Sequence, residues 1–179
     1  MSRALRFHEN QERDKAWVIF KMFNDQGNVE GMYWTAYYLF HGEGGQVQDK
    51  RRAFGIFLAV TRMELLMQSP TTAFEAMTQH QQMQQLHFQR LASNAHFYTA
   101  VCYLEGQGVE RNHLSGFGHM EVAADSGNAF AQFLVGDAYH KGSAVIQANM
   151  MRRNHYWQLA ARQREQRAID QCRKFGIPI

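Results

Sequence analysis

The residues of this chain best suited to metal chemistry are its nine histidines and two cysteines. His80 and His87 stand seven residues apart, and His113 and His119 stand six apart. A pair of helical metal ligands usually occupies positions i and i+4, on one face of the helix. No Cys, Asp or Glu completes a recognisable ligand set around either pair. The sequence therefore predicts neither a metal site nor a bound cofactor.

Catalytic motifs are missing as well. The chain contains no G-x-S-x-G nucleophile turn, no phosphate-binding loop and no H-E-x-x-H pair. The glycine-rich stretch at 42–45 is not followed by the Lys and the Ser or Thr of a phosphate cradle. We therefore expect that the protein is not an enzyme.

The composition favours one helical domain. The chain has 179 residues, of which 45% are hydrophobic and only two are proline. Two lone cysteines, Cys102 and Cys172, are too few for a disulfide framework. The first residues lack the apolar stretch of a signal peptide, and no segment is apolar enough to cross a membrane. We expect a cytoplasmic protein, with a secreted effector as the alternative.

Basic residues gather near the end of the chain. From residue 151 onward, seven basic residues stand against two acidic ones. Five of them form a candidate basic patch for a phosphate or an acidic ligand, namely Arg152, Arg153, Arg162, Arg164 and Arg167. The alternative is the polar outer surface that the last helix of a repeat array requires. We favour the second interpretation, and nucleic acid is not the expected partner.

Three glycines mark an internal repeat. Gly106 and Gly142 are 36 residues apart, and Gly42 precedes Gly106 by 64 residues, which equals one repeat plus an insertion of 28. The positions before each glycine agree in type. They are a small residue (Gly31, Ala95, Ala131), an aromatic residue (Tyr33, Phe97, Phe133), a second small residue (Ala36, Ala100, Gly136) and a large one (Leu39, Tyr103, Tyr139). Such spacing predicts a helix that a second helix approaches closely.

Each of these helices is followed by a second one. The terminal glycine suits a left-handed helix end, and Asp49 and Asn112 are the expected N-caps of the helices that follow. Apolar residues at helical spacing continue each second helix, as in Tyr156, Trp157, Ala160 and Ala161. His119 occupies the same column as Ile56 and Tyr156, so we expect it to be a packing residue.

These patterns resemble the Sel-one-like repeat family, a relative of the tetratricopeptide repeat. The second unit carries the likeness most clearly, with YLEGQGV at 103–109, Asn112 and Ala123-Ala124. The resemblance implies an all-α solenoid of two-helix repeats with about eight to nine helices. The expected parts are an N-terminal half-repeat or cap (8–28), repeat 1 (29–67), an inserted helix (68–92), repeat 2 (93–127), repeat 3 (128–163) and a C-terminal cap (164–179).

The resemblance also implies a function in interaction, because similar proteins are adaptors or scaffolds that bind a partner protein or peptide on the concave face of the first helices. Bacterial immunity and effector-type proteins are a narrower form of the same expectation. Candidate contact residues stand at or near variable columns of the repeat, namely Tyr37, His96, Val101, Gln132 and Asp137. The alternative function is binding of an acidic ligand or nucleic acid through the basic C-terminal helix.

The insertion at 68–92 offers a further candidate element. Its helix is expected to begin near Thr71 or Thr72 and is rich in glutamine, with a thin apolar stripe. Such a helix either lies exposed on the solenoid or contacts a partner. His80 and Gln84 are its candidate contact residues.

Overall fold

The computed structural model describes residues 1–67 and 77–179 of the chain. Those residues form nine α-helices and no strand, which confirms the all-α fold. The helices are α1 (Ser2–Glu9), α2 (Arg13–Asp25), α3 (Val29–His41), α4 (Lys50–Met67), α5 (Gln79–Glu105), α6 (His113–Asp125), α7 (Ala129–Lys141), α8 (Met150–Arg162) and α9 (Gln166–Lys174). None of these described helices is both long and apolar enough to span a lipid bilayer.

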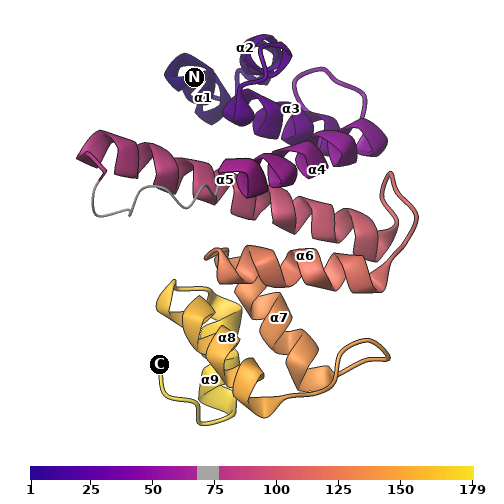
Figure 1. Cartoon of the computed structure of the whole chain (residues 1–179), viewed down its shortest axis with the longest axis vertical. Coiled ribbons are helices and arrows are strands. Elements are labelled where there is room, and N and C mark those ends of the chain that lie inside the picture. Colours follow the sequence, from indigo (N-terminus) through magenta and orange to yellow (C-terminus); the bar gives the residue numbers. More distant parts are fainter. Residues whose placement is uncertain (68–76) are drawn as a thin grey trace.

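The helices stack along one axis, with the two termini at opposite ends of the molecule (Figure 1). Each helix packs mainly on the next one along the chain, and α3 also contacts α5. The three repeats are the pairs α3/α4, α5/α6 and α7/α8. The helices α1 and α2 precede these pairs, and α9 follows them. This arrangement is an α-solenoid of two-helix repeats.

The hydrophobic core runs along the stack as overlapping clusters. One cluster lies among α1, α2 and α3, and the next joins α3, α4 and α5 around the fully buried Phe57. A third cluster has residues from α5, α6, α7 and α8. The last cluster packs α9 on α7 and α8 around the fully buried Trp157. Neighbouring clusters share a helix, so every repeat depends on its neighbours for burial.

Small side chains in the first helices permit close contact with the helices that precede and follow them in the chain. Gly136 of α7 is buried, and a Cβ atom added there would lie 2.3 Å from Cδ1 of Trp157 in α8. A Cβ atom added at the buried Gly31 of α3 would lie 2.5 Å from Cβ of Phe23 in α2. The backbones can therefore approach this closely only where the side chain is absent.

The turn from one repeat to the next is a short loop with a capping residue. Gly127 has a positive φ of 93°, and the side chain of Asn128 then accepts a hydrogen bond of 2.8 Å from the amide of Ala131. At the turn from α8 to α9, Arg164 takes the positive φ (65°) and Glu165 takes the capping position. The turn before α9 thus has the same backbone conformation as the turn before α7, although its residues differ.

The expected N-caps of the second helices are confirmed. Asp49 accepts a hydrogen bond from the amide of Arg52, and Asn112 accepts one from the amide of Ser115, both at 2.9 Å. Gly42 and Gly106 end their helices in the left-handed conformation, also as expected. Gly142 differs, with φ 68° and ψ 169°, because its loop closes through a hydrogen bond from the amide of Ser143 to the carbonyl oxygen of Ile146.

The inserted segment and the first helix of repeat 2 form one helix. The predicted helix start near Thr71 lies outside the described residues, and α5 begins after Thr78 in a capping box with Gln81. No helix stop separates 79–92 from 93–105 within α5, and Ser93 at their junction is buried and donates a hydrogen bond of 3.0 Å to the carbonyl oxygen of Ala123. The N-terminal half of α5 consequently projects beyond the neighbouring helices (Figure 1).

The contact at Gly136 leads to a stability prediction. The G136A variant should lower the free energy of unfolding by about 2 kcal/mol, because the fully buried Trp157 ring has no room to move away. The matched control is G55A in α4, where an added Cβ atom meets nothing within 4 Å. This control should gain about 0.5–1 kcal/mol from helix propensity. Urea denaturation measures both, and equal shifts in the two variants would contradict the packing argument.

Candidate functional site

Aromatic rings from four helices form a continuous strip over the first helices. Successive centroids are 6.1 Å (His8 to Tyr37), 5.9 Å (Tyr37 to Tyr98), 5.4 Å (Tyr98 to Phe97) and 5.5 Å (Phe97 to Phe130) apart. The five rings come from α1, α3, α5 and α7, and each is partly exposed. We call these five residues the aromatic strip. It is a surface of rigid side chains that support one another.

His8 and the two tyrosines of the strip are neutral at pH 7, as is the neighbouring His41. Burial raises the pKa of the Tyr37 and Tyr98 phenols, which therefore keep their protons. Burial also lowers the pKa of His8, and it does the same for His41, whose Nε2 lies 3.2 Å from the Tyr98 hydroxyl. The strip therefore presents polar hydrogen-bonding groups and apolar ring surface, without the desolvation cost of a charge.

Three of the five predicted contact residues, Tyr37, Val101 and Asp137, are partly exposed. Tyr37 is part of the aromatic strip and is partly buried rather than fully exposed. Val101 is partly buried between two core clusters on α5. Asp137 lies on α7, partly exposed, with an oxygen 3.3 Å from Nζ of Lys141.

The other two, His96 and Gln132, are buried and do not reach the surface. Both contact a neighbouring second helix, which for His96 belongs to the same repeat and for Gln132 to the preceding one. Nδ1 of His96 lies 2.9 Å from Nδ1 of His119 in α6, and Nε2 of Gln132 donates a hydrogen bond of 2.9 Å to the carbonyl oxygen of Ala124. These side chains connect helices and are not available to a partner. A variable column in the sequence was not sufficient to mark an exposed position.

His80 and Gln84 lie apart from the aromatic strip. Both are exposed on the projecting half of α5, and their side chains are hydrogen bonded to each other at 3.0 Å. The helix rise places Gln84 about 20 Å from Tyr98 along the same helix. The structure therefore does not bring these two residues together with the other candidates.

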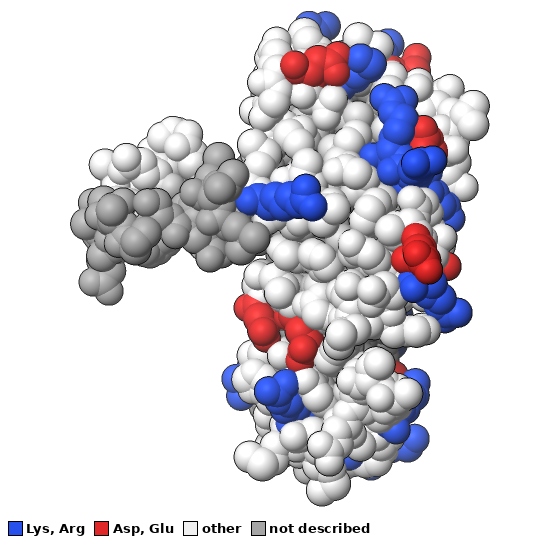
Figure 2. All heavy atoms as spheres, turned by 45° about the vertical axis from the view of Figure 1, so that its right-hand side comes forward, with Lys and Arg blue, Asp and Glu red and all other residues white. Residues whose placement is uncertain are grey.

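The five arginines of the predicted basic patch do not form one surface. Arg153 is buried, with its guanidinium 5.3 Å from the Trp157 ring and 4.9 Å from the Phe175 ring. Arg167 lies 4.2 Å from the Phe130 ring and donates to Glu165. Arg152 pairs with Glu121, while Arg162 and Arg164 are exposed. On the face in Figure 2, blue side chains are interspersed with red ones.

A groove between the second helices α6 and α8 was not predicted from the sequence. It has a volume of about 610 Å³ and is open to solvent. Its lining residues are Gly118, Glu121, Val122, Asp125, Met151, Arg152, His155 and Tyr156. We call it the α6–α8 groove. The lining residues are spread over two helices that are adjacent only in the folded stack.

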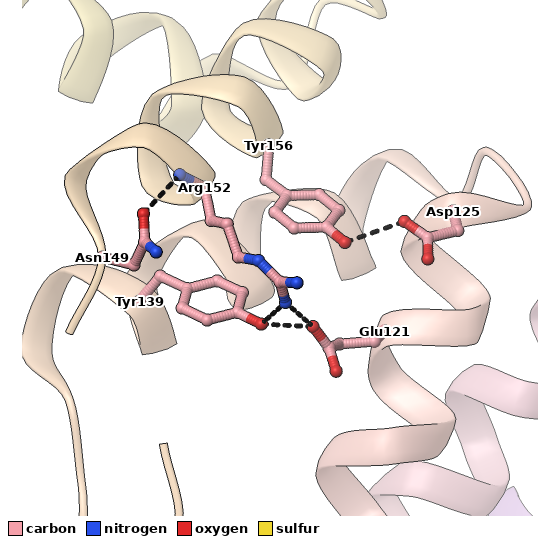
Figure 3. A network of polar contacts seen from close by, with 6 residues as sticks. All are labelled: Glu121, Asp125, Tyr139, Asn149, Arg152 and Tyr156. Carbon is pink, nitrogen blue, oxygen red and sulfur yellow. Dashed lines mark hydrogen bonds and ion pairs between the residues drawn. The ribbon is translucent and has the colours of Figure 1, made fainter. Parts of the chain in front are cut away.

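A polar network holds the charged groups of the groove in place (Figure 3). The Tyr139 hydroxyl donates to Oε1 of Glu121, and Nη1 of Arg152 lies 3.3 Å from the same oxygen and contacts the hydroxyl. The Tyr156 hydroxyl donates a hydrogen bond of 2.8 Å to Oδ1 of Asp125. Burial is the main reason that the pKa of both phenols is raised, so both remain donors.

Both tyrosines of the network are packing residues of the repeat. Tyr139 and Tyr156 are buried and stack on each other with a centroid separation of 6.1 Å and an interplanar angle of 5°. Tyr156 lines the groove, and the Tyr139 hydroxyl contacts two of its lining residues, Glu121 and Arg152. The repeat pattern in the sequence predicted that Tyr139 and Tyr156 pack in the core. It could not predict which residues their hydroxyl groups would contact. Within residues 1–67 and 77–179, no three His, Cys, Asp or Glu side chains gather as a metal site.

The buried histidine pair predicts a pH-dependent stability. Burial lowers the pKa of His119 to about 4, with a smaller contribution from His96. Two protonated rings would leave two donors facing each other. Neutral His119 therefore stabilises the fold fully above its ordinary pKa of 6.5, and this contribution is lost as the pH falls from 6.5 toward 4. Urea midpoints should decrease over this range, and H119F should show a smaller decrease. An unchanged pH profile in H119F would contradict this assignment.

Comparison with known proteins identifies the repeats. A sequence profile of the Sel1 repeat matches residues 29–58, 93–128 and 129–164, which together are more than half of the chain. Among curated proteins, none matches the chain in sequence.

Among solved structures, the Sel1 repeat protein from Oxalobacter formigenes is 19% identical, with a TM-score of 0.57 over 88% of this chain and 96% of that one. Another similar structure is c5321, a protective antigen of uropathogenic Escherichia coli strains that displays an SLR fold. It is 18% identical, with a TM-score of 0.43 over 87% of this chain and 35% of that one. The repeat profile and the shared stack of helix pairs lead to one conclusion: this chain belongs to the Sel1 repeat family.

Proposed function

We propose that the protein is a non-catalytic scaffold that binds a partner protein or peptide over its first helices. The observation that carries this proposal is the aromatic strip, which crosses α1, α3, α5 and α7 without interruption. Family membership supports the same conclusion, since Sel1 repeat proteins generally bind other proteins. Within the first helices, where partner binding was predicted, we assign the contact to the five rings of the aromatic strip.

Aromatic side chains are effective anchors for a partner. Tyrosine and phenylalanine bury a large area on binding and lose little conformational freedom, so they dominate many interfaces. The rings of the strip are already held by their neighbours, as in the Tyr98 ring, which stacks on the buried Phe57 with centroids 4.8 Å apart. A partner would therefore meet a preorganised surface, and preorganisation reduces the entropy lost on association.

Charged pairs border the strip at both ends. Arg13 and Glu43 form an ion pair near Tyr37 and Tyr38, since both charges influence the pKa of these phenols. At the other end, Arg167 lies 4.2 Å from the Phe130 ring and pairs with Glu165. An apolar and aromatic centre with a charged rim is the usual composition of a protein interface.

The basic C-terminal helix is the weaker candidate for a binding site. A nucleic acid or acidic ligand would need several arginines free to face it, and phosphate contacts dominate such binding. Arg152 and Arg153 are engaged with Glu121 and with aromatic rings, and Arg167 covers Phe130. These contacts favour the structural interpretation of the arginines and a protein partner for the scaffold.

Site-specific photo-crosslinking tests the proposal. A photoreactive phenylalanine analogue at position 37 or 130 should crosslink a partner in cell extract. The matched control carries the same analogue at position 22, because Met22 of α2 is 49% exposed and is not part of the aromatic strip. Mass spectrometry then identifies the captured protein. Crosslinks at position 22 alone, or none at positions 37 and 130, would contradict the proposal.

The purified partner allows a quantitative check. The Y37A variant should weaken its binding by about tenfold or more, since a central aromatic anchor contributes on that scale. M22A should bind as the wild type does. Thermal unfolding of Y37A must be measured alongside, because Tyr37 also packs against the core. Unchanged affinity in a folded Y37A variant would place the binding surface elsewhere.

A further inference from the structure

The two carboxylates of the α6–α8 groove differ in their surroundings. Glu121 is neutralised by Arg152, and its side chain is 27% exposed. Asp125 is exposed, and its carboxylate is held by the Tyr156 hydroxyl. No Lys, Arg or His among the described residues forms an ion pair with Asp125. The groove therefore carries one carboxylate with no cation beside it, in a position fixed by a hydrogen bond.

Besides Arg152 and His155, the rest of the groove is lined by apolar residues together with Gly118 and Tyr156. Val122 of α6 is 41% exposed and Met151 of α8 is 84% exposed, although both are large hydrophobic residues. Gly118 of α6 also lines the groove, and a Cβ atom added there would meet nothing within 4 Å, so this part of the groove is open. The buried Tyr156 ring lines the groove as well. Exposed apolar side chains around a hollow are typical of a surface that another molecule covers.

We propose that the α6–α8 groove is a second docking surface, for a segment of a partner protein that carries a Lys or Arg beside a large apolar side chain. A segment that covers Val122 and Met151 also removes water from Asp125. An ionised carboxylate withdrawn from water is costly unless a cation pairs with it. A neutral or acidic segment is therefore disfavoured, whereas a basic one gains an ion pair.

The polar network prepares the groove for this occupant. The Tyr156 hydroxyl holds Oδ1 of Asp125, so the carboxylate needs little reorganisation to receive a cation. Arg152 lies 5.2 Å from the Tyr139 ring and is paired with Glu121, so its positive charge is already compensated. The groove thus keeps a net negative charge at the end that Asp125 occupies. Its volume of about 610 Å³ admits side chains of the partner.

This surface is independent of the proposed function. The groove belongs to α6 and α8, whereas the aromatic strip belongs to α1, α3, α5 and α7. A protein with both surfaces could hold two partners, or two segments of one partner. Failure of either proposal leaves the other intact, because no residue is shared between the two surfaces.

Peptide selection tests the groove. A random linear peptide library displayed on phage is first depleted on the D125N/M151Q double variant and then selected on the wild-type protein. Sequences that survive should contain Lys or Arg next to Leu, Met, Phe or a similar residue. The best of them, synthesised with a fluorophore, should bind D125N about tenfold more weakly in fluorescence anisotropy.

The single variants are chosen to leave the fold unchanged. In D125N, the amide oxygen can still accept the hydrogen bond from Tyr156, so only the charge is lost. Its matched control is D170N, which removes a carboxylate from the exposed side of α9. M151Q should also weaken binding, and its control is M83Q, because Met83 is 67% exposed on α5.

Three outcomes would overturn the proposal. The first is that no peptide survives depletion on the double variant. The second is that the survivors lack basic residues. The third is that the synthesised peptide binds D125N and D170N equally well, which would show that the Asp125 charge has no role. Survivors with the expected composition that bind D125N and M151Q weakly, and both controls normally, would support the docking surface.

Discussion

The close contact of each first helix with the helices before and after it in the chain is the constraint on which the rest of the structure depends. It requires small side chains at two columns of each first helix. An added Cβ atom would lie 2.5 Å from Phe23 of the preceding α2 at Gly31, and 2.3 Å from Trp157 of the following α8 at Gly136. Large residues of the second helix, such as Trp157, fill the space beside the contact. Each repeat can cover its apolar surface only by packing on adjacent repeats. The same contact, repeated along the chain, therefore produces the whole stack.

The same constraint explains where the surface features lie. Several aromatic residues that pack one repeat on the next are only partly buried, so their rings or hydroxyl groups reach solvent. Over the first helices, this produces the aromatic strip from Tyr37 to Phe130. Between α6 and α8, the hydroxyls of Tyr139 and Tyr156 emerge beside two carboxylates. Both proposed binding surfaces are thus by-products of repeat packing, modified by a few residues outside the repeat pattern.

Much of the fold could be predicted from the sequence, because repeat columns and helix caps are local signals. Asp49 and Asn112 cap their helices as expected, since an N-cap needs only the amides of the following turn. The continuity of α5 was missed, because whether a helix stops between residues 92 and 93 depends on contacts such as that of Ser93 with Ala123. Less of the binding surface could be predicted. Tyr37 lies on the strip, whereas His96 and Gln132 proved to be buried.

The sequence by itself determined the repeat, the helix pairs and the family, because each is encoded in the spacing of residues along the chain. Tertiary structure alone decided which polar side chains remain available. The dense set of C-terminal arginines is an example. Arg153 is buried between Trp157 and Phe175, Arg152 is paired across to α6, and only part of the set stays exposed. Whether a side chain is available to a partner depends on residues of other helices that pack beside it. The sequence alone does not show which distant residues these are.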